Sequence, residues 1–278
     1  MSCGFASPLD PRGHQGDERQ GEGDRGEALD QGCALVTGAA RRLGRAIAMA
    51  LAQKNFAVAL HTSERSRAEA DEVCAAIRAV GGRACVLTAD LADPQAVAGL
   101  MAGARAALGP VTLLVNNASL FEADAASAFD ARLFDQHMAV NLRAPLQLAS
   151  DFAAQLPEGR EGLIVNLLDQ RVWRLNPHFF SYTLTKSALW TATQTMAQAF
   201  APRIRVNGVG PGPTLANHMQ RAEDFRREAE SIPLQRAITP DEIVAAVLFL
   251  LEARSVTGQM IAVDGGQHLA WKTPDVLD

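Results

Sequence analysis

The feature that most constrains the fold of this chain is a regular alternation of short apolar runs and longer helical stretches. Seven runs rich in apolar or β-branched residues are separated by stretches whose apolar residues recur at helical spacing. Such alternation produces βα units with parallel strands. The sequence therefore predicts an α/β fold with a doubly wound, seven-stranded parallel sheet, its strands at 33–38, 56–62, 83–89, 111–116, 162–168, 204–209 and 259–263.

One domain accommodates all of these elements, because 278 residues with 48% hydrophobic content can bury a large core. Residues 1–31 are rich in Gly, charged residues and Pro, and they are predicted to form a disordered leader. The predicted domain spans 32–270, and 271–278 form a tail. The predicted helices are 44–54, 68–80, 93–108, 131–155, 182–201 and 239–252.

Composition excludes several classes of partner. The net charge is −5 and no block of Lys and Arg is present, so nucleic acid and anionic membrane surfaces are unfavourable partners. No apolar run approaches the roughly 20 residues of a membrane span, and no secretory signal begins the chain. The four cysteines and six histidines lack metal-binding spacing. We therefore expect a cytoplasmic protein that binds a small molecule and no metal.

A turn with two glycines follows the first predicted strand. Gly38 and Gly44 bracket the sequence "GAARRLG", which opens a helix. Glycines allow the backbone to approach a pyrophosphate, and the helix N-terminus carries a favourable partial positive charge. The pattern predicts a dinucleotide site, although a βα protein without one can also contain such a turn.

The residues after the second predicted strand favour NADPH over NADH. A fold that prefers NADH places an acidic residue there, on the ribose hydroxyls. This chain has Ser63, Arg65 and Ser66 instead, and hydroxyl and guanidinium groups bind a 2′-phosphate. Glu64 opposes this assignment unless its carboxylate points to solvent, whereas Arg42 adds a second cation within the glycine turn.

Tyr182 and Lys186 are the strongest candidates for catalysis. Tyr182 is the only tyrosine in the chain, and Lys186 follows one helical turn later on the same face. A phenol has an ordinary pKa of about 10. A nearby ammonium and a positively charged nicotinamide would lower that pKa, and Tyr182 could then give a proton to a substrate atom that receives hydride.

Asp169 precedes Tyr182 by thirteen residues. An ionised aspartate only accepts hydrogen bonds, so it would repel a ketone oxygen but would suit a substrate with N–H groups. If it is desolvated and protonated, it could relay a proton through Tyr182. The alternative is structural, with Asp169 capping the following loop or pairing with Arg171.

Together these motifs resemble the short-chain dehydrogenase/reductase family over about residues 32–270. The family motifs correspond to the turn at 37–44, Asp90 with Leu91, "NNAS" at 116–119, Asn141, the Tyr182/Lys186 pair and "NGVGPGP" at 207–213. The resemblance implies a Rossmann-type domain. It places the cofactor on Gly38, Arg42, Leu43, Gly44, Ser63, Arg65, Ser66, Asp90, Leu91, Asn117, Ala118, Ser119, Tyr182, Lys186, Pro211 and Gly212.

Two departures from the family pattern are similar to its pteridine reductase branch. Arg42 stands where the family has glycine, and Asp169 stands where it has a catalytic serine. That branch carries an arginine and an acid at the same positions. The resemblance implies that Phe121 stacks on a pterin and that the substrate contacts Arg42, Ser119, Phe121, Asp169 and Tyr182.

The sequence thus predicts an NADPH-dependent reductase of a pterin or dihydropteridine of the biopterin, monapterin or folate type, with Tyr182 as proton donor. One alternative is a carbonyl reductase acting on a 3-oxoacyl thioester or a sugar ketone. A third hypothesis is a protein that senses the NADPH/NADP ratio without turnover.

Three further expectations concern the surroundings of the site. Asn141 either holds a water that links Lys186 to solvent, as the family resemblance implies, or kinks its helix. The polar segment 213–235 is either a mobile lid over the substrate or an amphipathic surface helix. The resemblance also implies a homotetramer built on the helices at 130–155 and 181–201.

Overall fold

A seven-stranded parallel sheet forms the centre of the computed structural model, which describes residues 31–217 and 219–271. Most of the predicted leader and tail lie outside these residues. The strand order is β3-β2-β1-β4-β5-β6-β7. The strands are β1 (Cys33–Val36), β2 (Ala57–Thr62), β3 (Ala84–Thr88), β4 (Val111–Asn116), β5 (Gly162–Leu167), β6 (Ile204–Pro211) and β7 (Met260–Val263). The predicted fold class is confirmed.

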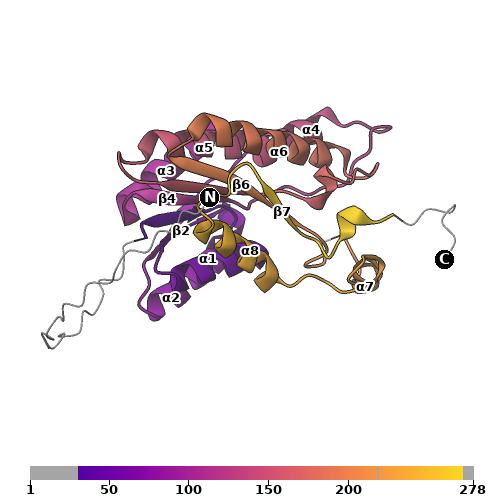
Figure 1. The fold of residues 1–278 in the computed structure, drawn as a ribbon, viewed down its shortest axis with the longest axis horizontal. Coiled ribbons are helices and arrows are strands. Elements are labelled where there is room, and N and C mark those ends of the chain that lie inside the picture. The colour runs from indigo at the N-terminus through magenta and orange to yellow at the C-terminus, as the bar shows by residue number, and fades with distance from the viewer. Residues whose placement is uncertain (1–30, 218, 272–278) are drawn as a thin grey trace, which may run out of the picture.

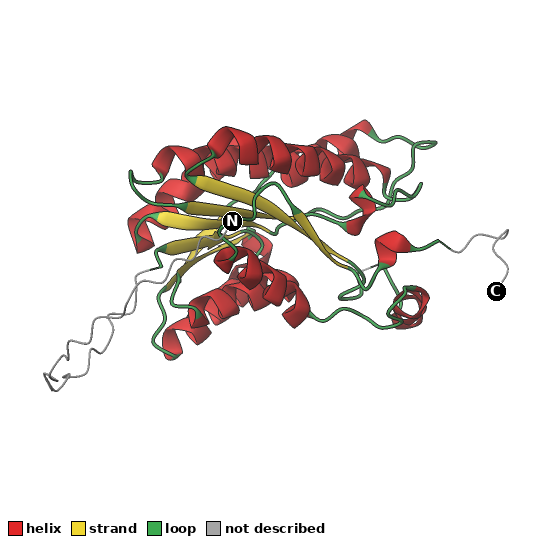
Figure 2. Ribbon diagram, viewed as in Figure 1, coloured by secondary structure: helices red, strands yellow, loops and turns green. Residues whose placement is uncertain are grey.

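Helices cover both faces of the sheet, as Figures 1 and 2 show. One layer contains α1 (Arg42–Gln53), α2 (Arg67–Ala79) and α8 (Pro240–Glu252). The other contains α3 (Pro94–Leu108), α4 (Ala131–Met138), α5 (Ala144–Gln155) and α6 (Phe180–Phe200). The short α7 (Ala222–Ser231) lies beyond the end of the sheet, beside the segment that follows β7.

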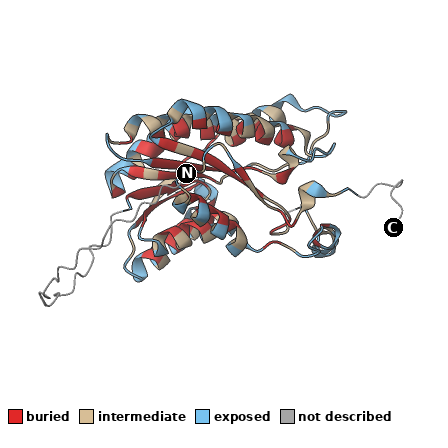
Figure 3. Ribbon diagram, viewed as in Figure 1, coloured by how far each residue is buried: buried red, intermediate tan, exposed pale blue. Residues whose placement is uncertain are grey.

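The strands are buried on both faces, which explains why they read as continuous apolar runs in the sequence. All residues of β1, β2 and β5 are buried, and Figure 3 shows the sheet as the most buried layer. One apolar cluster packs the sheet against α1 and α8, and includes Ile47, Leu51 and Ile243. A second packs the other face against α3 and α5, and includes Leu148 and Phe152.

The order in which successive strands are added to the sheet reverses between β1 and β4. From β1 the chain builds outward through β2 to β3, and then returns to form β4 on the other side of β1. In such sheets, ligands bind in the crevice outside the carboxyl ends of the strands at this switch point. The glycine turn after β1 and the "NNAS" motif at the end of β4 both lie there.

The helix predicted at 131–155 is interrupted in the structure. Residues Ala139–Arg143 form a π-helical turn between α4 and α5, and Asn141 lies in its middle. The prediction of one continuous helix was wrong in this respect, because periodicity does not distinguish α from π turns. Single π turns inside α-helices are frequent at functional sites.

Candidate active site

The glycine turn is held tightly against the end of β4. Gly38 has a φ of +64°, and a Cβ at that position would lie 3.0 Å from the Cα of Ala118. A Cβ at Gly44 would lie 2.1 Å from the carbonyl oxygen of Gly38, so only glycine fits. Nδ2 of Asn117 donates to the carbonyl oxygens of Thr37 at 2.8 Å and Gly38 at 3.2 Å. These contacts fix the backbone that opens α1.

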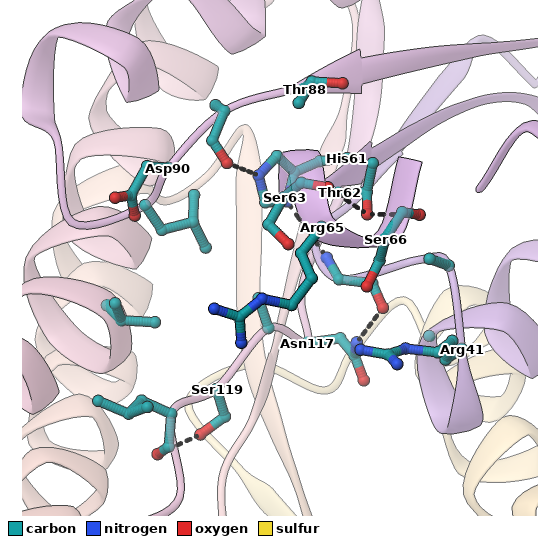
Figure 4. Close-up of a pocket in the computed structure, with 18 of the residues that line it drawn as sticks. Arg41, His61, Thr62, Ser63, Arg65, Ser66, Thr88, Asp90, Asn117 and Ser119 are labelled. Atoms are coloured by element: carbon teal, nitrogen blue, oxygen red, sulfur yellow. Dashed lines mark hydrogen bonds between the residues drawn. The ribbon is translucent and has the colours of Figure 1, made fainter. Parts of the chain in front are cut away.

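A cavity of about 1000 Å³ extends over this turn and the carboxyl ends of the neighbouring strands. Arg65 extends into it from the loop after β2, and Asp90, Asn117 and Ser119 lie around it (Figure 4). The predicted cofactor residues that line it are Gly38, Arg42, Leu43, Gly44, Ser63, Arg65, Ser66, Asp90, Leu91, Asn117, Ala118 and Ser119.

This cavity has the size, shape and chemistry for an adenine dinucleotide. The glycine cradle leaves room for a pyrophosphate at the N-terminus of α1. Ser63, Arg65 and Ser66 line the same cavity and supply the donors that a 2′-phosphate requires. Glu64 also lines the cavity, but its side chain is exposed, so its charge is screened by solvent.

His61 also lines the first cavity. It is 2% exposed; its Nδ1 accepts from the N–H of Gly38 at 3.2 Å, and its Nε2 lies 3.2 Å from the carbonyl oxygen of Ala89. A neutral ring with the proton on Nε2 satisfies both contacts. Burial lowers the pKa of His61 to about 4. His61 therefore ties together the ends of β1, β2 and β3.

A second cavity, of about 660 Å³, lies next to the first and shares Arg41, Arg42, Leu43, Asn117 and Ser119 with it. The predicted residues that line it include Phe121, Asp169, Tyr182, Lys186, Pro211 and Gly212. The structure thus brings the predicted substrate residues together with Asp169, Tyr182 and Lys186 beside the nucleotide cavity, whereas Asn141 is not part of this lining.

Tyr182 and Asp169 make the central contact of this second cavity. The hydroxyl of Tyr182 donates to Oδ2 of Asp169 at 2.9 Å. The predicted lowering of the Tyr182 pKa requires a positively charged nicotinamide as well as Lys186; burial and the neighbouring Asp169 carboxylate raise this pKa well above its ordinary value. The expected counterion is otherwise engaged, because Nζ of Lys186 donates to the carbonyl oxygen of Leu167 at 2.7 Å.

Lys186 is itself perturbed. It is 2% exposed, and burial lowers its pKa to about 8. Its ammonium lies 5.6 Å from the centre of the Tyr182 ring. Lys186 therefore provides positive charge near the phenol but does not contact its oxygen.

The structural interpretation of Asp169 agrees with its contacts, and its predicted catalytic role stays a prediction. Oδ1 accepts from the backbone N–H of Arg171 at 2.8 Å and caps the short helix Gln170–Val172, and Oδ2 faces the Arg171 guanidinium at 3.3 Å. The same oxygen accepts from Tyr182. The structural contacts of Asp169 thus aim its carboxylate at the phenol.

Asn141 links the π turn to the loop after β4. Its Oδ1 accepts from the N–H of Leu120 at 2.7 Å and from the hydroxyl of Ser119 at 3.2 Å, and its Nδ2 donates to the carbonyl oxygen of Leu120 at 2.9 Å. It also donates to Thr185, one residue before Lys186. Asn141 therefore fixes the loop that carries Phe121, and its predicted part in a water-mediated path stays a prediction.

Phe121 belongs to an aromatic cluster at the wall of the second cavity. Its ring stacks on Phe179 with centroids 4.2 Å apart, and meets Tyr182 edge-on at 4.7 Å. Phe179 has a φ of +56°, which is rare for a bulky residue. Arg171 lies nearby, with its Cζ 5.4 Å from the centre of the Phe121 ring, and only the fold brings these two side chains together.

Arg42 joins the glycine turn to the segment after β6. Its guanidinium donates to the carbonyl oxygens of Ala216 at 2.7 Å and Leu215 at 2.9 Å. These residues begin the predicted lid, which contains α7 and residue 218, the latter outside the described residues. Gln220, Phe225 and Glu228 of this segment line the second cavity. The segment thus lies beside the second cavity, and its role as a mobile lid or as a surface helix stays a prediction.

The described residues also bear on membranes and metals. Across 31–217 and 219–271, no helix has the length and apolar character needed to cross a bilayer. In the same two ranges, no group of three or more His, Cys, Asp and Glu side chains is arranged to hold a metal ion.

The fold and the paired cavities define a dinucleotide-dependent oxidoreductase. A family model described as enoyl-(acyl carrier protein) reductase matches residues 38–268. This match covers most of the chain, and the chain belongs to the short-chain dehydrogenase/reductase family that the motifs indicated.

Two similar solved structures come from Brucella. The chain is 52% identical to FolM alternative dihydrofolate reductase 1 from Brucella canis, complexed with NADP, with a TM-score of 0.87 over 91% of this chain and 100% of that one. The corresponding Brucella suis protein, also with NADP, is 54% identical, with a TM-score of 0.86 over 90% and 99%. The NADP in both agrees with the cofactor predicted from the sequence.

More distant relatives act on other substrates. L-xylulose reductase from Bos taurus is 35% identical over 84% of this chain and 95% of its own length. Family membership therefore establishes the fold and the oxidoreductase class, but it does not identify the substrate.

Proposed function

We propose that this protein is an NADPH-dependent reductase of a dihydropterin, with Tyr182 as the proton donor. The observation that carries the proposal is the Tyr182–Asp169 contact at 2.9 Å, in a cavity that also exposes the ring of Phe121. The similarity to two FolM alternative dihydrofolate reductases supports the same substrate class.

The lining of the two cavities accounts for cofactor binding. Arg65, Ser63 and Ser66 would hold the 2′-phosphate, the turn from Gly38 to Gly44 the pyrophosphate, and Lys186 the nicotinamide ribose. Bound NADPH would supply hydride to the carbon of a substrate C=N bond. The nitrogen of that bond then needs one proton, and this proton is the protein's contribution.

Tyr182 is placed to give that proton. Its side chain is largely buried but lines the second cavity, and the nearby Lys186 ammonium stabilises the tyrosinate that forms. Asp169 accepts N–H groups of the substrate or passes a proton to Tyr182. Phe121 offers a flat apolar surface for a ring system.

A carbonyl reductase is the second candidate. The similarity to L-xylulose reductase favours it. Asp169 opposes it, because an ionised carboxylate repels the oxygen of a ketone where a hydroxyl would stabilise it. A sensor without turnover would not require the Tyr182, Asp169 and Lys186 arrangement.

Steady-state assays separate the candidates. Purified protein is mixed with NADPH and either dihydrobiopterin, dihydromonapterin, dihydrofolate, a 3-oxoacyl thioester or L-xylulose, and NADPH absorbance is followed. Oxidation with a dihydropterin supports the proposal. Turnover with ketones alone would replace it with the second candidate, and binding of NADPH without any turnover would favour the sensor.

We further propose that the protein is cytoplasmic and works as a homotetramer built on α4, α5 and α6, as the family resemblance implies. Light scattering of the purified chain measures its mass directly. A mass of one or two chains would contradict the tetramer.

A further inference from the structure

Arg171 is a largely buried cation beside Tyr182 and Asp169, the proposed catalytic pair. Its side chain is 17% exposed, its guanidinium lies 3.3 Å from Oδ2 of Asp169, and that carboxylate is 14% exposed. Oδ2 is the same oxygen that accepts the Tyr182 hydroxyl hydrogen. One carboxylate oxygen therefore connects the guanidinium to the phenol.

The aromatic cluster holds this guanidinium in position. Its Cζ lies 5.4 Å from the centre of the Phe121 ring and 5.2 Å from that of Phe179, distances at which a cation is attracted to aromatic rings. Phe179 has a left-handed backbone conformation, and its ring stacks on the ring of Phe121. Both rings therefore restrict where the side chain of Arg171 can lie.

Arg171 occupies this position at an energetic cost. Its Nε is buried and has no hydrogen-bond partner among the residues that the structure describes. A buried donor without a partner destabilises the folded state, and unusual backbone such as that of Phe179 adds to this cost. Such costs gather at sites where geometry serves a function.

The charge balance around Tyr182 gives Arg171 a function. When Tyr182 gives up its proton, its oxygen becomes an anion beside the Asp169 carboxylate, and the two repel each other. The Lys186 ammonium is bound to the carbonyl oxygen of Leu167, whereas Arg171 pairs directly with the carboxylate that causes the repulsion. Consistent with this, the charge of Arg171 lowers the pKa of Tyr182 and so opposes the effect of Asp169.

We propose that Arg171 is a positioning residue for proton donation: it orients the Asp169 carboxylate toward Tyr182 and neutralises its charge as the tyrosinate forms. This role rests on the proposed function, because it takes Tyr182 as the proton donor. It extends the catalytic machinery to a residue that acts only through Asp169 and the aromatic pair.

The single tyrosine of the chain makes a direct test possible. Protein labelled with ¹³C at the tyrosine Cζ gives one tyrosine resonance, which reports the ionisation of Tyr182 without any substrate. The NADP complexes of the wild type, Arg171→Met, Arg171→Lys and the control Arg174→Met are titrated from pH 7 to pH 12, because burial and Asp169 raise the pKa of Tyr182 well above its ordinary value. Arg174 lies in the same loop with an exposed side chain, so its replacement controls for general charge.

Arg171→Met is expected to lower the acid dissociation constant of Tyr182 about tenfold and kcat about tenfold or more, with NADPH affinity unchanged. Arg171→Lys should restore part of both effects, and Arg174→Met should match the wild type. A titration of Arg171→Met that overlays the wild-type curve would overturn the proposal. Failure of the wild type to reduce any dihydropterin would instead overturn the proposed function, because the resonance is measured without substrate.

Discussion

The hydroxyl of Tyr182 donates to Oδ2 of Asp169 across 2.9 Å, inside a cavity that continues from the nucleotide site. A serine at position 169 would instead present a hydroxyl group that can donate to a carbonyl oxygen. The identity of this one side chain therefore sets whether the site favours a substrate that donates or one that accepts hydrogen bonds. This relationship leads to the first prediction.

Asp169→Ser should reduce the kcat/KM of dihydropterin reduction at least about tenfold and increase turnover of ketones, because the acceptor becomes a donor. Tyr182→Phe should lower kcat by about 10²-fold or more for every substrate while NADPH still binds. Steady-state kinetics and NADPH fluorescence measure both. Asp135→Ser, on the exposed face of α4, is the control. Unchanged pterin turnover in Asp169→Ser would assign the carboxylate a purely structural role.

Arg42 supports a second prediction, since it has a φ of +52° and its guanidinium holds the carbonyl oxygens of Leu215 and Ala216. Arg42→Gly removes these bonds but relieves the backbone, and we expect the KM values of NADPH and substrate to rise several-fold with little loss of stability. Arg42→Ala removes the same bonds and keeps a Cβ, so it should be less stable than Arg42→Gly by about 1 kcal/mol. Equal KM values in wild type and Arg42→Gly would show that the bonds to the lid segment do not assist binding.

Much of the fold could be predicted from the sequence because burial on both faces leaves a strong signal in each strand. All seven predicted strands agree with the structure to within two residues at either end, as for β4 at Val111–Asn116. The glycine turn could also be predicted from the sequence, since only glycine fits at Gly38 and Gly44. These features are local, and local chemistry specifies them.

The contacts that escaped prediction join distant parts of the chain. His61 binds groups 23 and 28 residues away, and nothing in "LHT" distinguishes it from a core histidine. Arg171 was considered only as a partner of Asp169, because its contacts with Phe121 and Phe179 require the folded loop. The raised pKa of Tyr182 likewise follows from burial and from the Asp169 carboxylate beside its hydroxyl, which spacing along the helix does not reveal.

The lowered pKa of His61 predicts how stability depends on pH. The unfolded chain takes up a proton on this ring below about pH 6.5, whereas the folded protein keeps it neutral until about pH 4. The free energy of unfolding therefore decreases as pH falls from about 6.5 to about 4, by at most about 3 kcal/mol from this residue, and its contribution is fully present above that window.

His61→Gln removes this titration, so its stability should decline less than that of the wild type within the same window. Chemical denaturation at pH 7.5, 5.5 and 4.5 measures the difference. His178→Gln, which changes an exposed histidine, should keep the wild-type dependence. Parallel profiles for wild type and His61→Gln would contradict the assignment.

Glu228 leads to the last prediction, which concerns the part of the substrate that extends from the reacting ring. Its carboxylate lines the second cavity and accepts from Nε2 of Gln220 at 2.8 Å and from Nε2 of Gln267 at 3.3 Å. The wall formed by these three side chains carries a negative charge and amide groups. It suits hydroxyl groups and repels carboxylates.

A dihydropterin with a neutral hydroxylated side chain should therefore have a lower KM than dihydrofolate, whose glutamate tail is anionic. Glu228→Gln should lower the KM of dihydrofolate about fivefold, corresponding to about 1 kcal/mol of repulsion, and leave that of the neutral substrate unchanged. Salt should reduce the difference between the two proteins, because it screens the charges. Glu230→Gln, on the exposed face of α7, is the matched control. Equal dihydrofolate KM values for wild type and Glu228→Gln at low salt would show that Glu228 does not face the tail, and the selection among pterins would then have to come from Phe225 and the backbone of the segment after β6.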